Sequence, residues 1–341
     1  MTAQAQRETA EPAARERPAT PATNAADKPA TSGAAKTPVK KTLKIPVWVE
    51  TEAGHYWQEG QRQSFKIQLD EKDAPVRALQ NAASGTVILL IFDTVADLAG
   101  TEEAKRALAT LLGELPDNYW IGVFRSLDGL RVLQEPTGDR KAALEKIQTV
   151  DVGGRAGLLD TLEPVTDLGM AMLQRAGVRI AALYVTDSLI SQYRADYLNP
   201  VINASDAGDL SRRFSDRAVQ ERMSQLAESL SSRTIPLFVL HFERRSDALN
   251  LAYQSGLERI ATDSGGQAIF CRTTDEIRPS LSSLLDRLRA QYLLSVEATD
   301  TRRPFVKVKV EAVDKQGAAP GRVSYASQVV LGKNGGKKGK P

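Results

Sequence analysis

Cysteine is almost absent from this chain of 341 residues, in which Cys271 is the one cysteine. A single thiol excludes an intramolecular disulfide and any zinc site built from several cysteines. Because Cys271 ends the apolar stretch AIFC, we expect it to be a small buried core residue. Histidine is also scarce, with His55 in a turn and His241 at the end of an apolar stretch. Two separated histidines are too few for a histidine-rich metal site, so we expect both to be structural.

Long apolar runs are missing as well. No stretch is long and apolar enough for a transmembrane helix. Residues 1–40 lack the apolar centre of a signal peptide, and they are rich in Ala, Thr, Pro and Lys, as flexible linkers are. We therefore expect residues 1–41 to be a linker or tail, and residues 333–341 to be a basic tail.

Basic and acidic residues are nearly balanced, because the chain has 45 Lys and Arg residues and 42 Asp and Glu residues, which gives a net charge of +3. Several of the basic residues lie in the two terminal segments, where solvation is the simplest role. The rest of the sequence has no basic stripe interleaved with aromatic residues, so we expect no nucleic-acid partner.

The residues between the tails follow two patterns. Residues 42–84 and 292–332 contain alternating apolar stretches typical of strands. Residues 85–291 alternate short apolar runs with amphipathic helices, which predicts a doubly wound α/β fold with a mostly parallel sheet covered on both faces. We expect the two flanking segments to pair into a smaller, discontinuous β module, with extension of the main sheet as the alternative. A hairpin is expected at Asp128-Gly129.

Two apolar runs in the α/β region end in acids. VILLIFD ends at Asp93, with Asp97 shortly after it, and RIAALYVTD ends at Asp187. In a doubly wound sheet of order 3-2-1-4-5-6, the first and fourth strands are neighbours at the switch point. We therefore expect Asp93 and Asp187 to lie side by side at the carboxyl-terminal edge of the sheet. Carboxylate oxygens there would suit Mg²⁺ or Ca²⁺.

The order and spacing of these segments resemble a von Willebrand factor A (VWA) domain, of the bacterial type with flanking β segments. The resemblance covers about residues 45–332 and includes the strand before Asp93, LLDTL after a Gly-Gly turn, TDS, IPLFVLHF and LERIATDSGGQAIF. VWA domains build a metal-ion-dependent adhesion site from a D-x-S-x-S loop, a distant Thr and a distant Asp, and the cation binds an acidic group of the partner. The resemblance implies a protein partner, an adhesion-type role and an extracytoplasmic setting.

The sequence departs from that motif at two oxygen donors. Val95 and Ala156 stand where the motif has Ser and Thr, and Asp97 replaces the second Ser. The ligands that remain are Asp93, Asp97 and Asp187. Three readings follow: acids that only accept backbone hydrogen bonds, a weak Mg²⁺ or Ca²⁺ site completed by water, or a complete adhesion site. The lost hydroxyl groups favour the first two, so we expect no cofactor or a weakly bound cation.

The expected partner surface is formed by the loops at this edge of the sheet. The connection that follows Ser188 is long for a compact domain, and Tyr and Arg are residue types that dominate interfaces. Covering of the core is the alternative role for that connection. We further expect a raised carboxyl pKa, or a pairing with Arg155, to relieve the repulsion among the acids. The side chains assigned to partner binding are Thr94, Arg155, Ser188, Tyr193, Arg194 and Tyr197.

Enzyme signatures are missing too. The sequence has no G-x-G-x-x-G after its first apolar run, no P-loop and no G-x-S-x-G. DSGGQ at 263–267 superficially resembles a hydrolase motif, but Gly-Gly more simply ends a helix. We therefore expect a non-enzymatic module that binds another protein, with a metal-assisted hydrolase as the alternative. The sequence identifies neither that protein nor the oligomeric state.

Overall fold

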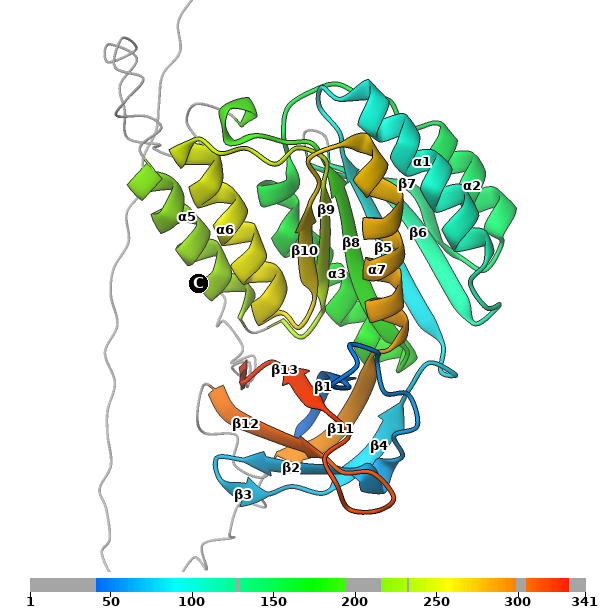
Figure 1. Ribbon diagram of the computed structural model, residues 1–341, viewed down its shortest axis with the longest axis vertical. Helices are drawn as coiled ribbons and strands as arrows, with labels where there is room; N and C mark the ends of the chain where they lie inside the picture. Colours follow the sequence, from blue (N-terminus) through cyan, green and yellow to red (C-terminus); the bar gives the residue numbers. More distant parts are fainter. Residues whose placement is uncertain (1–40, 127–128, 194–215, 232, 299–304, 331–341) are drawn as a thin grey trace, which may run out of the picture. The chain divides into compact units, whose positions relative to one another are not determined.

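The computed structural model describes residues 41–126, 129–193, 216–231, 233–298 and 305–330 (Figure 1). They belong to one compact unit, Pro38–Pro341, in which an α/β part is joined to a β-sandwich. The expected tails lie outside the described residues, except for Lys41. No helix in the described ranges is both long enough and apolar enough to cross a membrane.

The α/β part is built on a six-stranded sheet with the order β10-β9-β8-β5-β6-β7. Its strands are β5 (Thr86–Asp93), β6 (Tyr119–Ser126), β7 (Leu130–Thr137), β8 (Arg179–Thr186), β9 (Leu237–His241) and β10 (Gln267–Phe270). All neighbouring strands are parallel except β6 and β7. Numbered along the chain, this order is 3-2-1-4-5-6, which confirms the predicted doubly wound sheet.

Helices cover both faces of the sheet (Figure 1). One layer contains α1 (Leu98–Gly113), α2 (Arg140–Gln148) and α7 (Ile277–Arg289). The other contains α3 (Leu158–Ala176), α5 (Asp216–Leu230) and α6 (Ala248–Asp263). The side chains of β5 alternate between the layers, with Leu90 in the first core and Leu89 in the second. Burial on both faces is why this strand is apolar from Val87 to Phe92.

The antiparallel edge of the sheet is the predicted hairpin. Ser126 at the end of β6 pairs with Leu130 at the start of β7. Gly129 precedes β7 with a φ of 103°, a left-handed conformation that glycine adopts without a steric penalty. The pairing on either side of the turn agrees with the predicted hairpin, while Asp128 itself lies outside the described residues.

The flanking segments form a sandwich of two four-stranded sheets with the orders β13-β1-β11-β4 and β14-β12-β2-β3. The strands are β1 (Lys41–Glu50), β2 (Phe65–Leu69), β3 (Lys72–Asp73), β4 (Val76–Gln80), β11 (Tyr292–Ala298), β12 (Phe305–Ala312), β13 (Arg322–Tyr325) and β14 (Gln328–Val330). β1 pairs with β11, and β2 pairs with β12. One apolar core lies between the two sheets. The predicted discontinuous β module is therefore present.

Buried Arg179 fixes the junction between the two parts. Its Nη1 donates to the main-chain oxygens of Arg289 at 3.1 Å and Gln291 at 2.9 Å. Its Nη2 donates to Oγ1 of Thr86 at 2.5 Å and to the hydroxyl of Tyr119 at 3.1 Å. Arg289 ends α7 and Gln291 directly precedes β11, so one side chain ties the sheet to the point where the chain enters the sandwich.

Candidate functional site

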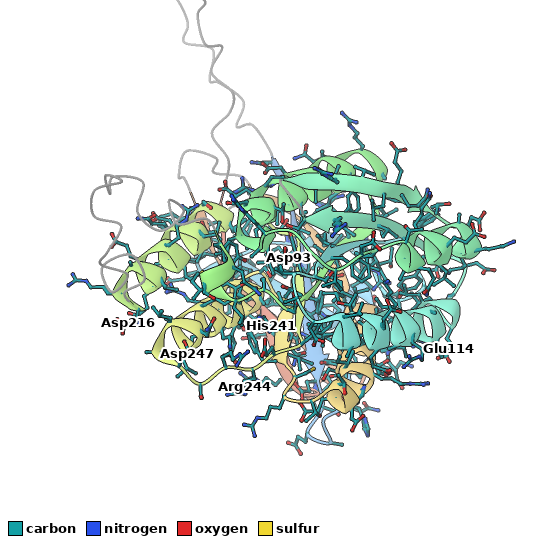
Figure 2. The ribbon with its side chains drawn as sticks, turned by 90° about the horizontal axis from the view of Figure 1, so that it is seen from above. Asp93, Glu114, Asp216, His241, Arg244 and Asp247 are labelled. Carbon is teal, nitrogen blue, oxygen red and sulfur yellow. The ribbon has the colours of Figure 1, made fainter. Side chains whose placement is uncertain are left out.

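Asp93 ends β5 and lies near the centre of the view from above (Figure 2). Its side chain is 1% exposed. Oδ1 accepts a 2.9 Å hydrogen bond from the N–H of Gly157, the N-cap of α3, and Oδ2 accepts one of 3.2 Å from the hydroxyl of Thr186. Burial raises the pKa of Asp93 to about 6, although these hydrogen bonds favour the charged form. We expected a raised carboxyl pKa from repulsion among the acids, whereas the cause here is burial.

Asp187 follows β8 directly and is 2% exposed. Its carboxylate holds the loop after β5, since Oδ1 accepts from the N–H of Val95 at 2.6 Å and Oδ2 from that of Ala96 at 2.7 Å. The N–H of Asp97 also donates to Oδ2. β5 and β8 are neighbours, and Asp93 pairs with the residue before Asp187. The predicted placement of the two acids at adjacent strand ends is confirmed.

Asp97 is a helix cap. Its side chain accepts a 2.9 Å hydrogen bond from the N–H of Gly100 at the start of α1. Aspartate is among the strongest N-cap residues because it satisfies an N–H group that has no partner within the helix. The third acid is therefore also engaged by the backbone.

The side chains at this edge do not form the coordination shell of oxygen ligands that a hard cation requires. The carboxylate of Asp187 faces three N–H groups, and Asp97 caps a helix. Val95 is half-buried against the apolar core, and the methyl group of buried Ala156 offers no oxygen. Within the described part of the chain, no group of three or more His, Cys, Asp or Glu side chains is placed to hold a metal ion. The geometry agrees with acids that accept backbone hydrogen bonds.

A buried polar network lies beside the acids. The hydroxyls of Tyr193 and Tyr253 lie 3.0 Å apart, and Oγ of Ser188 lies 3.0 Å from that of Tyr253. His241 places Nε2 at 2.8 Å from the carbonyl oxygen of Ser188, while its Nδ1 accepts from the N–H of Glu243. This pattern requires a neutral ring with the proton on Nε2. Burial lowers the pKa of His241 to about 4, so the buried ring is neutral near pH 7.

Three residues that the sequence assigned to the partner surface are buried. Thr94 is 3% exposed, Ser188 0% and Tyr193 4%, so the prediction that they face a partner is wrong. The 3-10 helix η2 (Ile190–Gln192) explains the burial of Tyr193, because residues three apart in such a turn share one side. Ile190 and Tyr193 both enter the core. The spacing of these two residues is the signal that indicates covering of the core.

Of the other assigned residues, Arg155 is exposed at this edge, and Arg194 and Tyr197 lie outside the described residues. The expected pairing of Arg155 with an acid is replaced at Asp187 by backbone N–H groups. Sequence reasoning missed Leu98, which is 63% exposed at the start of α1. Leu98 lies on the same face of α1 as the buried residues Thr101 and Leu108, so the period of the helix predicts a buried residue at position 98.

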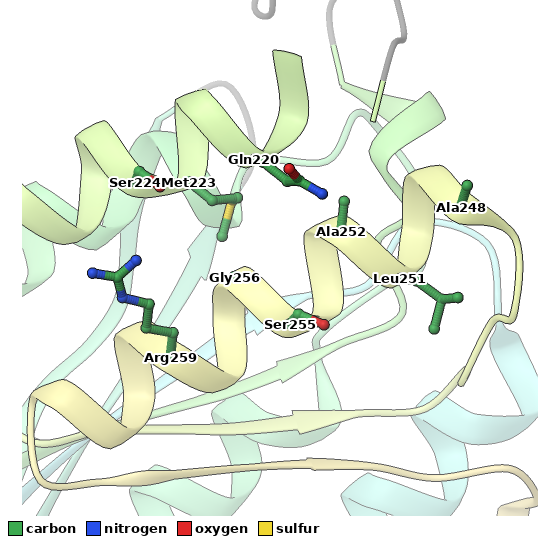
Figure 3. A pocket seen from close by; sticks show the side chains of 9 residues that line it. All are labelled: Gln220, Met223, Ser224, Ala248, Leu251, Ala252, Ser255, Gly256 and Arg259. Atoms are coloured by element: carbon green, nitrogen blue, oxygen red, sulfur yellow. The ribbon is translucent and has the colours of Figure 1, made fainter. Parts of the chain in front are cut away.

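A groove of 440 Å³ lies between α5 and α6 (Figure 3). Most of its wall consists of small or apolar side chains, and a Cβ atom added to Gly256 would lie 2.5 Å from Cγ of Met223. The two helices therefore pack closely, which leaves a shallow depression. Arg259 is its one charged wall residue. The groove offers apolar contact rather than a set of reactive groups.

No protein-family model matches the sequence, and no curated protein matches it. Among solved structures, the chain is similar to the conserved hypothetical protein BatB from Bacteroides thetaiotaomicron, with 15% identity, 60% of this chain and 98% of that chain covered, and a TM-score of 0.37. It is similar to the SpRpn10 VWA domain, with 13% identity, coverage of 60% and 94%, and a TM-score of 0.40.

A third similar structure is the von Willebrand factor type A protein from Catenulispora acidiphila, with 10% identity, coverage of 88% of this chain and 76% of that chain, and a TM-score of 0.43. At these identities the likenesses concern the fold alone. The strand order, the hairpin at the edge of the sheet and the two helical layers are those that the sequence pattern predicts for a doubly wound α/β fold. The chain therefore has the doubly wound α/β fold that its sequence predicts, extended by a β-sandwich built from its flanking segments.

Proposed function

We propose that this chain is a non-enzymatic binding module whose protein partner contacts the carboxyl-terminal edge of the six-stranded sheet. The observation that carries the proposal is the exposed side chain of Leu98, which directly follows the loop held by Asp187. Single exposed apolar residues are common on proteins. A residue presented by a fixed loop, however, loses little conformational freedom on binding, which favours affinity.

The loop around Arg155 supports the same surface. Gly153 and Gly154 have φ values of 139° and 92°, in the region that favours glycine. The N–H of Gly153 donates to the carbonyl oxygen of Thr94 at 3.1 Å, and Nη2 of Arg125 donates to that of Gly153 at 3.2 Å. These bonds join two loops of the edge into one surface. Arg155 supplies it with an exposed residue of a type enriched in interfaces.

The chemistry of the reactive side chains also supports a binding role. His241 and Cys271 are both 0% exposed, and burial raises the pKa of the thiol. A metal-assisted hydrolase would need free carboxylates at the edge, where Asp187 and Asp97 are bound by backbone N–H groups. The proposal keeps two further expectations from the sequence: an adhesion-type role outside the cytoplasm of a bacterium, and a partner other than nucleic acid.

The test starts with a photo-cross-linking amino acid at position 98 of the full chain. An equivalent probe at position 305 serves as the control, because Phe305 is also an exposed apolar residue, at 44%, but lies in the sandwich. A protein captured from position 98 is then purified, and its affinity for the chain is measured. We expect Leu98→Asp and Arg155→Glu each to weaken binding about tenfold or more, and Phe305→Asp to leave it unchanged.

Equal capture at both positions would contradict this surface. A captured protein whose affinity is unaffected by Leu98→Asp and Arg155→Glu would contradict it as well. Turnover of that protein by the purified chain, lost in Asp187→Asn, would favour the hydrolase alternative.

A further inference from the structure

The three N–H groups of Val95, Ala96 and Asp97 converge on one point, which the carboxylate of Asp187 occupies. Successive backbone N–H groups that point into one concavity form an anion-binding nest. Such a nest is usually completed by an external anion. Here the anion belongs to the neighbouring strand of the same sheet.

The orientation of these groups matters for the choice of ion. Each N–H carries its partial positive charge on the hydrogen, and all three hydrogens face the two oxygens of Asp187. A divalent cation bound to those oxygens from the loop side would face the positive ends of three N–H dipoles and would be repelled by them. It would also take from three partly buried N–H groups the acceptor that they share, which is costly.

The nest is supported from both sides of the loop. Before it, the carbonyl oxygen of Thr94 accepts from the N–H of Gly153 at 3.1 Å. After it, Asp97 caps α1 by accepting from the N–H of Gly100. The two ends of the loop are thus held independently of Asp187, so removal of its carboxylate would empty the nest without releasing the whole loop.

We propose that Asp187 is an internal anion that closes the β5–α1 loop in place of a divalent cation. The loop keeps its shape without Mg²⁺ or Ca²⁺, and the nest accepts a small carboxylate of the formate or acetate class once the side chain of residue 187 is removed. This inference does not rest on the proposed partner surface. It concerns the state of the loop, which is measured without any partner.

The test uses the full chain and its variants Asp187→Ala and Asp187→Asn, with Asp151→Ala as the control. Asp151 is an exposed acid in the facing loop. The readout is amide hydrogen exchange of residues 94–98. In Asp187→Ala we expect exchange about tenfold faster or more, because hydrogen bonds to a charged group are lost. Formate or acetate should restore most of the protection, whereas chloride at the same ionic strength should not.

Asp187→Asn gives a second route if the alanine variant does not fold. It keeps the shape but removes the charge and one acceptor, so we expect an intermediate loss of protection, while Asp151→Ala should match the natural chain. In the natural chain, Mg²⁺, Ca²⁺ and chelator should leave exchange of residues 94–98 unchanged.

Three results would overturn the inference. The first is protection of residues 94–98 that falls on addition of chelator or rises with Mg²⁺ or Ca²⁺ in the natural chain. The second is unchanged protection in both variants of Asp187. The third is a loss of protection in Asp187→Ala that formate and acetate fail to reverse while the strands of the sheet keep their own protection.

Discussion

The N–H of Gly157 lies 2.9 Å from Oδ1 of Asp93, so the first turn of α3 rests on a carboxyl group that is almost fully buried. Burial raises the pKa of that group from 3.8 to about 6. Between about pH 4 and pH 6 the folded chain keeps the proton while the unfolded chain has lost it. Rising pH in this window therefore favours the unfolded state.

We expect the free energy of unfolding to fall by up to about 3 kcal/mol through this window because of Asp93, and to be level above it. Asp93→Asn keeps an acceptor for Gly157 but does not titrate. The difference between the natural chain and this variant, from urea denaturation at pH 4 to 8, isolates the effect. Asp151→Asn is the exposed control. A constant difference between natural chain and Asp93→Asn across the range would contradict the prediction.

Restoring the missing hydroxyl groups should not restore a strong cation site. Val95→Ser with Ala156→Thr returns two oxygen donors, but Asp187 stays engaged by the loop. Calorimetric titration should give Mg²⁺ affinity weaker than about 1 mM for the natural chain and the double variant alike. Micromolar binding by either would show that the carboxylates are free to leave their backbone partners.

Tyr193 should behave as a core residue. We expect Tyr193→Ala to lower the free energy of unfolding by about 3–5 kcal/mol, the usual cost of removing a buried aromatic ring. Tyr193→Phe removes only the hydroxyl that meets Tyr253, for which about 1 kcal/mol is expected. Leu251→Ala is the control, since Leu251 is 43% exposed. If the melting curves of Tyr193→Ala and the natural chain coincide, Tyr193 does not contribute to the core and this prediction is wrong.

Arg179 should stabilise both parts of the chain. Arg179→Met leaves the partly buried carbonyl of Arg289 and the buried carbonyl of Gln291 without this donor, so we expect a loss of about 2–4 kcal/mol in the free energy of unfolding. Arg77→Met is the matched control, because Arg77 forms an exposed 3.0 Å ion pair with Glu297, worth less than about 1 kcal/mol. If urea denaturation shows the same loss in the free energy of unfolding for both substitutions, Arg179 does not stabilise the junction more than an exposed ion pair does, and the prediction is wrong.

Deletion of 292–341 should unfold the N-terminal strands. β1 would lose both of its neighbours, β11 and β13, and β2 would lose β12. Amide exchange of residues 42–84 should then approach the rate of an unfolded chain. Unchanged protection of these residues in the shortened chain would mean that they fold without their partners.

The sheet could be predicted because its signals are local and strong. A strand buried on both faces has to be apolar over most of its length, as β5 is from Val87 to Phe92, and an Asp-Gly pair favours the turn before β7. The pairing of the flanking segments followed from their alternating pattern, since each needs a second apolar face to cover its own. These features depend on composition and period, which a sequence displays directly.

The roles of the acids could not be predicted in full, because they depend on which backbone groups face them. Asp93 and Asp187 were placed at the correct strand ends, yet their sequence positions say nothing of the N–H groups of Gly157 or Val95. The exposure of Leu98 could not be predicted either. Its phase predicts burial, while its exposure depends on what lies beyond the first turn of α1.

The sandwich also imposes an order on biosynthesis. β1 and β2 leave the ribosome before the whole α/β part, and their partners β11 and β12 leave after it. The apolar faces of the first strands have no permanent cover during that interval, a condition in which nascent chains depend on chaperones or aggregate. The last strands to be synthesised complete the first ones, so a ribosome that stops within α7 releases a chain in which β1 has neither of its neighbours and β2 has only the two-residue strand β3.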